Sequence, residues 1–167
     1  YICAVSKVIK KTAEARNMPV PEILMEPGRS IVAAAGITLY TVGGIKDIPN
    51  IRTYVSIDGG MCDNPRYALY KSEYEALVAN KANQPRDKVV TIAGKCCESG
   101  DLIGEHMPLQ ECEPGDILAV CATGAYNYSM SSNYNRLMKP AVVFVKDGEA
   151  RLAVRRETLE DIVRNDI

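Results

Sequence analysis

A cysteine among charged residues is the first feature of this sequence that could do chemistry. The run from Gly94 to Asp101 (GKCCESGD) holds two thiols, two carboxylates and a lysine around two glycines. A thiol in such surroundings can act as a general acid, because neighbouring charges set its pKa. Adjacent residues in extended backbone point in opposite directions, so only one of Cys96 and Cys97 can face a given site. Free cysteines are also among the most buried residues, so this run alone leaves a structural role open.

A glycine beside an arginine near the N-terminus could hold a phosphate group. In residues 26–30 (EPGRS), Gly28 allows a close approach of the backbone, and Arg29 adds a positive charge. The residues that follow suggest a helix, whose free amides at its start would favour an anion. The same five residues also suit an ordinary turn with a solvated arginine, because short motifs are weak signals.

A second candidate for anion binding lies in residues 58–70 (DGGMCDNPRYALY). Its glycines and its Asp-Asn-Pro run predict a sharp loop after a strand. Arg66 and Tyr70 could then project together and bind a carboxylate, the arginine through a bidentate pair of hydrogen bonds. A plain surface loop explains this segment equally well.

A third segment, residues 124–135 (GAYNYSMSSNYN), is rich in hydroxyl and amide groups beside aromatic rings. Aromatic faces can pack against a flat cofactor, so this composition favours a binding role. Metal binding is not expected, since the six cysteines form no CxxC pair and the single histidine, His106, has no ligand spacing.

The bulk composition is that of a soluble globular protein. Hydrophobic residues make up 47% and charged residues 25%, and the formal net charge is −1, so a nucleic-acid partner is not expected. No apolar run approaches the roughly 20 residues of a membrane span, and no secretory signal is visible. These properties favour a cytoplasmic protein with reduced thiols. The sequence opens inside an amphipathic pattern without a methionine, so we expect a piece of a longer chain.

The N-terminal part predicts the last βα unit of an incomplete α/β (TIM-type) barrel, residues 1–36. Apolar residues recur at helical spacing over residues 2–16, and Asn17 and Pro19 should end that helix. Residues 23–25 (ILM) predict a short buried strand that leads into the glycine-containing turn.

The remaining residues, 37–167, predict a C-terminal β domain that ends in a helix. Runs rich in β-branched and aromatic residues alternate with turn signals, at residues 37–45, 53–57, 89–93, 117–121, 141–145 and 150–154. Asp147-Gly148 between two such runs predicts a hairpin, and Thr158 with Asp161 predicts the cap of the last helix. The fold class is therefore mainly β, as a β-sandwich or a small barrel.

Taken together and in this order, the four segments resemble the fold-type III, barrel-type decarboxylases that use pyridoxal 5′-phosphate, and within them the diaminopimelate decarboxylase family. The resemblance rests on EPGRSIVAAAG, DGGMCDNPRYALY, CCESGD and GAYNYSMSSNYN, and it extends over nearly the whole chain. Tyr67 stands where that family often has proline. The resemblance implies loss of carbon dioxide from meso-2,6-diaminopimelate to give L-lysine, in a homodimer whose active site lies at the subunit interface.

The resemblance also implies a role for individual residues. It makes Cys97, immediately before Glu-Ser-Gly-Asp, the general acid. The substrate would contact Arg29, Arg66, Tyr70, Glu98 and Tyr126. The cofactor would contact Glu26, Pro27, Gly28, Arg29 and Tyr126.

No lysine in the sequence stands in the context of the family's Schiff-base lysine, so this piece alone is not expected to decarboxylate a substrate.

Two alternative functions remain open. A related decarboxylase of ornithine, arginine or carboxynorspermidine is the nearest alternative. A stand-alone β domain that only binds a partner or dimerises is the other.

Overall fold

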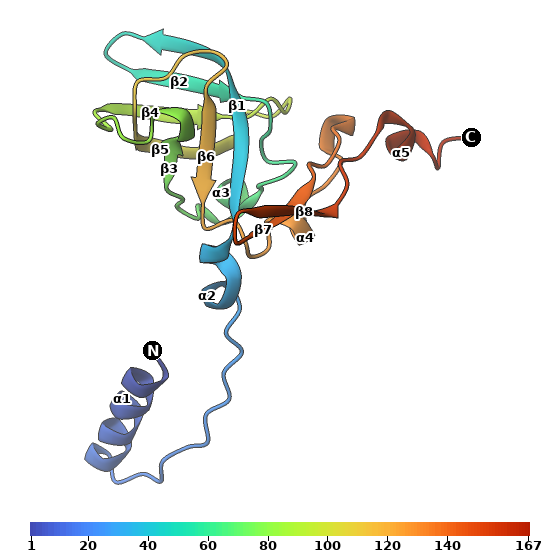
Figure 1. Ribbon diagram of the computed structural model, residues 1–167. Helices are drawn as coiled ribbons and strands as arrows, with labels where there is room; N and C mark the ends of the chain where they lie inside the picture. The colour runs from blue at the N-terminus through green and yellow to red at the C-terminus, as the bar shows by residue number, and fades with distance from the viewer.

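The computed structural model describes residues 1–167, and its main body is a six-stranded sheet (Figure 1). The strands are β1 (Ile37–Ile48), β2 (Arg52–Ile57), β3 (Ala76–Val78), β4 (Lys88–Ala93), β5 (Leu102–Leu109) and β6 (Ile117–Cys121), in the order β3-β6-β1-β2-β4-β5. Neighbouring strands are antiparallel except β2 and β4, which are parallel. This architecture confirms the prediction of a mainly β protein.

The sheet curls until its two edge strands meet, which makes a small, nearly closed barrel. The backbone amide of Val78 in β3 donates to Oε1 of Gln110, directly after β5, at 2.9 Å. Apolar side chains from all six strands fill the interior, among them Val42, Val55, Val78, Ile92, Ile103 and Leu118. Closure protects edge strands that would otherwise offer free hydrogen-bonding groups.

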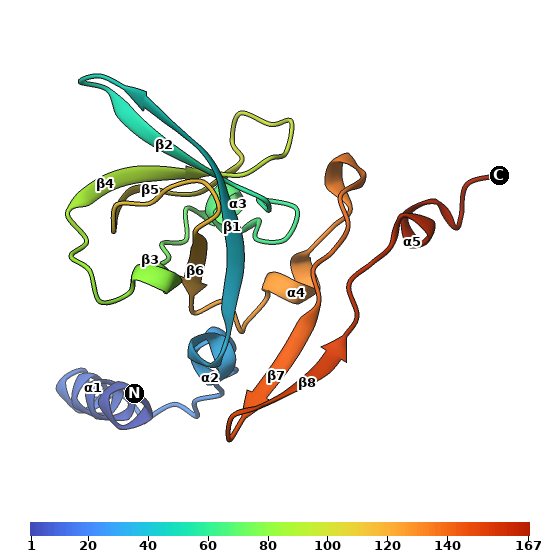
Figure 2. The same ribbon diagram turned by 45° about the horizontal axis from the view of Figure 1, so that its top comes forward.

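A separate hairpin and a short helix follow the barrel. Strands β7 (Val142–Lys146) and β8 (Glu149–Val154) form their own two-stranded sheet and project from the barrel with α5 (Leu159–Val163), as Figure 2 shows. Asp147 and Gly148 have φ of 53° and 81°, the left-handed pair of a tight hairpin turn. Thr158 and Asp161 form a capping box at α5. The predictions of the hairpin and of the capped helix are confirmed.

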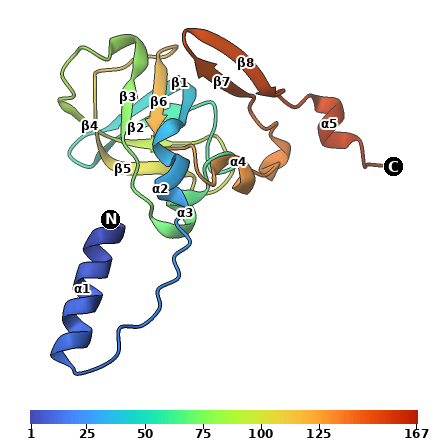
Figure 3. The same ribbon diagram turned by 60° about the horizontal axis from the view of Figure 1, so that its bottom comes forward.

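The N-terminal residues differ in part from the expectation. Helix α1 (Ile2–Ala15) is present as predicted and lies away from the barrel, joined to it by an extended segment (Figures 1 and 3). The predicted strand at residues 23–25 is wrong: these residues form no ladder, and Leu24 is 89% exposed. A strand needs a neighbour to pair with its amides and carbonyls, and no strand of this chain lies beside residues 23–25.

The transition into the barrel comes directly after two short helices. Helix α2 (Arg29–Val32) and the 3₁₀ turn η1 (Ala33–Ala35) lead into β1 at Ile37. The division of the chain into domains at residues 36 and 37 stays a prediction. None of the helices has the length and apolar character needed to cross a membrane.

Candidate active site

An arginine between two tyrosine rings forms the centre of the first cluster. Arg66 and Tyr70 are the first and last residues of α3 (Arg66–Tyr70), so they lie one helical turn apart. The guanidinium carbon of Arg66 lies 5.0 Å from the centre of the Tyr70 ring and 4.9 Å from that of Tyr126. Such contacts hold a cation without neutralising its charge. The structure therefore brings three of the predicted substrate-binding residues together.

The positive charge of Arg66 has no carboxylate partner within the chain. Its polar contacts are long: Nη1 lies 3.8 Å from the sulfur of Met130, and Nη2 lies 3.5 Å from Oγ of Ser72. Its Nε is buried and has no hydrogen-bond partner. A planar guanidinium with free donors suits bidentate binding of a carboxylate.

Tyr126 connects this cluster to Gly28 of the EPGRS segment. A Cβ atom on Gly28 would lie only 2.0 Å from the hydroxyl oxygen of Tyr126, so a larger residue at position 28 would displace that hydroxyl. Tyr126 itself has φ of 73°, a left-handed backbone that costs energy for a bulky residue. Downstream of Gly28, the amide of Gly124 donates to the carbonyl of Ala33 at 3.0 Å. The segments around Gly28 and Tyr126, about 100 residues apart in the sequence, are therefore in contact.

Arg29 lies beside an aromatic ring that sequence reasoning missed. Its guanidinium carbon lies 5.1 Å from the centre of the Tyr74 ring, and the Tyr74 hydroxyl donates to Oδ1 of Asn127 at 3.3 Å. Arg29 forms no ion pair, so its charge is also available to an anion. Glu26 is exposed and makes no hydrogen bond, and Pro27 is also exposed.

The predicted helix after Gly28 is shorter than expected for a phosphate site built from a helix start. It begins at Arg29 and turns into a 3₁₀ helix at Ala33. Arg29 and Gly28, rather than a long helix, are the groups that an anion would meet here.

The cysteine loop between β4 and β5 is the second cluster. Cys96 is buried, whereas Cys97 is exposed, so the two thiols face different surroundings, although residues 95–98 form a bend and not the extended backbone on which the prediction rested. The carboxylate of Asp101 fixes the loop by accepting the amides of Cys96 and Met61, each at 2.6 Å. A Cβ on Gly94 would lie 2.2 Å from that carboxylate, so glycine is required for this close approach. The loop is therefore tied to residues 59–63.

Buried polar groups lie beneath this loop. The hydroxyl of Tyr40 donates to Oδ1 of Asp63 at 2.5 Å. Burial raises the pKa of Asp63, and burial likewise raises the pKa values of the Cys62 and Cys96 thiols. These two cysteines therefore stay protonated at neutral pH and act as structural residues, which leaves Cys97 as the exposed thiol of this cluster.

Two residues beside Cys97 and Glu98 were not singled out from the sequence. Both belong to the 3₁₀ turn η3 (Tyr134–Arg136). The amide of Cys97 donates to Oδ1 of Asn135 at 2.7 Å. Loss of water contact, and then the nearby carboxylate of Glu98, raises the pKa of Tyr134. The composition of residues 124–135 indicated a binding segment, but no sequence signal connected it to the cysteines.

Within the chain, the two clusters are separate. No hydrogen bond, ion pair or cation–π contact joins Cys97 or Glu98 to Arg29, Arg66 or Tyr126. In Figures 1 and 2 the loop between β4 and β5 lies beside η3 and away from α2. A backbone hydrogen bond joins the segment that follows Tyr126 to the loop that holds Cys62: the amide of Ser132 donates to the carbonyl of Cys62 at 2.8 Å.

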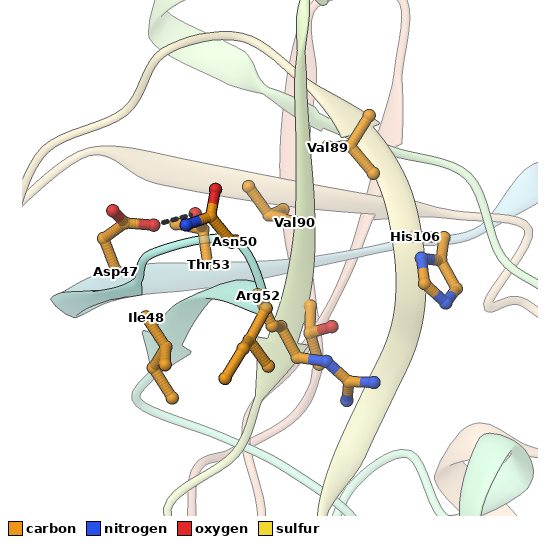
Figure 4. Close-up of a pocket in the computed structure, with 10 residues that line it drawn as sticks. Asp47, Ile48, Asn50, Arg52, Thr53, Val89, Val90 and His106 are labelled. Atoms are coloured by element: carbon orange, nitrogen blue, oxygen red, sulfur yellow. Dashed lines mark hydrogen bonds between the residues drawn. The ribbon is translucent and has the colours of Figure 1, made fainter.

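A hollow elsewhere on the barrel does not involve either cluster. It lies at the β1–β2 turn and is lined in part by Asp47, Arg52, Thr53 and His106, as Figure 4 shows. Arg52 is paired with Glu105 at 2.7 Å, whereas the carboxylate of Asp47 accepts the Thr53 hydroxyl at 2.7 Å and has no cationic partner. The charge of Arg52 is therefore not free for an anionic ligand. His106 lies in β5 at φ of 54°, at an irregular point of the strand.

A family model matches most of this chain. The model described as the C-terminal sheet domain of pyridoxal-dependent decarboxylases matches residues 3–124. The chain belongs to this decarboxylase family. The matched residues include the EPGRS, DGGMCDNPRYALY and CCESGD segments, whereas Tyr126 and η3 lie beyond them.

Curated relatives and solved structures of this decarboxylase family agree with the match. The chain is 54% identical to the diaminopimelate decarboxylase of Bacillus subtilis over 167 residues, which are 100% of this chain and 38% of that protein. The crystal structure of diaminopimelate decarboxylase from M. jannaschii in complex with L-lysine superposes with a TM-score of 0.78 at 36% identity, covering 96% of this chain and 36% of the other.

A more distant member shares the fold. The lysine/ornithine decarboxylase of Vibrio vulnificus, in complex with cadaverine, has a TM-score of 0.56 at 22% identity, covering 73% of this chain and 33% of the other. The chain thus spans about 38% of the length of the curated relatives it matches.

Proposed function

We propose that this chain is the C-terminal sheet domain of a pyridoxal-phosphate-dependent decarboxylase that converts meso-2,6-diaminopimelate to L-lysine and carbon dioxide. One observation carries the choice of substrate: the guanidinium of Arg66 is held between two tyrosine rings and has no carboxylate partner. Diaminopimelate has a carboxylate at the end that does not react, and ornithine has none. A free guanidinium is the group that would distinguish the two substrates.

The residues around Gly28 fit the cofactor's phosphate and ring. Gly28 gives close access to the backbone, and Arg29 has a charge without an ionic partner. Tyr126 presents an aromatic ring and a hydroxyl at the same place. Glu26 and Pro27 would complete the cofactor contacts as flanking residues. These residues would hold pyridoxal phosphate, which would supply an electron sink for the decarboxylation.

The cysteine loop would supply the proton and one substrate contact. The Cys97 thiol donates its proton to the carbon that has lost carbon dioxide, and the carboxylate of Glu98 binds the far amino group of the substrate. Tyr70 supports Arg66 at the far carboxylate.

We propose a homodimer because the two clusters do not meet within one chain. Cys97 of one copy would complete the Arg66–Tyr126 cluster of a second copy at the subunit interface. The six free cysteines suit a reducing compartment, so we also propose a cytoplasmic location.

The test uses the full-length protein that contains this chain, loaded with pyridoxal phosphate. Carbon dioxide release is measured from meso-diaminopimelate and, in parallel, from ornithine and arginine. We expect turnover of diaminopimelate and little from the others. Release from ornithine but not from diaminopimelate would contradict the proposal and favour the related decarboxylase. No release from any of them would favour a binding or dimerisation domain.

Mixing two impaired variants of the full-length protein, assayed at a substrate concentration well below KM, tests the interface. Cys97→Ala and Arg66→Gln subunits should regain activity when combined, because one of the two sites in a mixed dimer receives an intact Cys97 and an intact Arg66. The failure of every mixture to regain activity would contradict a shared site.

A further inference from the structure

The backbone around Cys97 forms a tight turn with the cysteine at its apex. The amide of Glu98 donates to the carbonyl of Cys96 at 2.8 Å, a three-residue turn centred on Cys97. Asp101 fixes the residue before the apex by accepting the Cys96 amide. The turn itself leaves the Cys97 amide without a partner, and Oδ1 of Asn135 accepts it at 2.7 Å.

Asn135 is itself held in a special backbone conformation. Asn135 and Arg136 have φ of 53° and 55°, so two successive residues lie in the left-handed region. Polar contacts hold the flanks: Nδ2 of Asn133 donates to Glu157 at 2.6 Å, and Arg136 pairs with Asp166 at 2.5 Å. Residues near the C-terminus thus position the Asn135 side chain over the cysteine loop.

We propose that Asn135 is a positioning residue that fixes the direction of the Cys97 thiol. This inference rests on the proposed role of Cys97 as the general acid. The thiol is attached to the residue whose amide Asn135 binds, so loss of that hydrogen bond frees the apex of the turn. Proton transfer depends on the direction of the donor, whereas Arg66 and Tyr70 bind the substrate in the other cluster and exposed Glu98 in this turn contributes only a small part of the binding. The effect should therefore fall mainly on kcat, with KM within about 2-fold of its original value.

Two substitutions in the full-length protein separate the hydrogen bond from the backbone conformation. Asn135→Gly removes the acceptor but keeps access to the left-handed region. Asn135→Asp keeps an acceptor oxygen at the same position. Asn50→Gly is the matched control, because Asn50 has φ of 62° at the distant β1–β2 turn.

Two measurements are made on each variant: steady-state kinetics, and the alkylation rate of Cys97 by iodoacetamide followed by peptide mass spectrometry. For Asn135→Gly we expect kcat to fall about 10-fold with KM within about 2-fold, because misplacing a reacting group by a fraction of an ångström lowers the rate steeply. Cys97 alkylation should become about 3-fold faster as the turn loosens. Asn135→Asp and Asn50→Gly should have kinetic constants and a Cys97 alkylation rate close to those of the protein without a substitution.

The alkylation rate of Cys97 tests the positioning role of Asn135 even if the proposed reaction is wrong. An unchanged alkylation rate in Asn135→Gly, or an unchanged kcat, would overturn the positioning role. A loss in Asn135→Asp as large as in Asn135→Gly would also overturn it. Full turnover in Cys97→Ala would instead reject the thiol as the acid, which is a failure of the proposed function and is distinct from these outcomes.

Discussion

The Arg66–Tyr126 cluster and the cysteine loop differ in how their polar groups are satisfied. In the first, Arg66 and Arg29 lie against aromatic rings and have no ionic partner. In the second, the side chains of Asp101 and Asn135 accept hydrogen bonds from the amides of Cys96 and Cys97, and of the two adjacent thiols only that of Cys97 is exposed. Unsatisfied charge suits the binding of a ligand, whereas a saturated backbone suits a reacting group that must not move.

Cys97→Ala in the full-length protein should give the largest effect, because it removes the only reacting group of the loop. We expect kcat to fall by about 10²–10⁴-fold, the usual contribution of a general acid. Cofactor absorbance should remain, since Arg29 and Gly28 lie in the other cluster. Cys3→Ala, which removes an exposed thiol from α1, is the control. Undiminished turnover would remove the thiol from the mechanism.

Asp101→Ala tests whether the loop is fixed by its buried carboxylate. The substitution leaves the amides of Met61 and Cys96 without their partner, and we expect the free energy of unfolding to fall by about 2–4 kcal/mol. Urea denaturation of the full-length protein measures this change. Asp58→Ala is the control, because exposed Asp58 accepts one amide, that of Thr41 at 2.8 Å. Equal losses in both variants would contradict the special role of Asp101.

Arg66→Gln tests the Arg66–Tyr126 cluster, where we expect substrate binding to weaken more than the rate of the chemical step. Loss of a charged pair to the substrate carboxylate should raise KM by about 10-fold or more, with a smaller change in kcat. Arg52→Gln is the control, since Arg52 is already paired with Glu105 outside the cluster. A normal KM in Arg66→Gln would reject the carboxylate contact and, with it, the argument for diaminopimelate over ornithine.

Glu98→Gln should give the smallest effect, because Glu98 is exposed and water screens its charge. We expect KM to rise about 3-fold, as for a solvent-exposed ion pair. The raised pKa of Tyr134, caused first by loss of water contact and then by the Glu98 carboxylate, should move toward its ordinary value in this variant. Glu111→Gln, at an exposed position, is the control. If KM is unaltered, Glu98 does not bind the substrate amine.

Local sequence signals predicted many of the strands and helices, and pairing between distant strands explains those that were missed or wrongly predicted. The runs that became β1, β2, β4 and β6 were rich in β-branched residues, and the hairpin and the α5 cap followed from short polar motifs. Strand β3 is only three residues long, and β5 contains glycine, histidine and proline, so neither stood out. Both are strands because they pair with β6 and β4. Residues 23–25 had strand composition but no partner.

The sequence by itself determined the chemical types of the site and the family to which the chain belongs. It predicted that Arg66 and Tyr70 would project together from a sharp loop, and the structure places them one turn apart on the short helix α3. Only the tertiary structure decided that Tyr126 stacks on Arg66, that Tyr74 lies under Arg29, and that Asn135 binds Cys97. These partners are 38 to 60 residues apart in the sequence, so their contact depends on strand order and barrel closure, which local propensity does not encode.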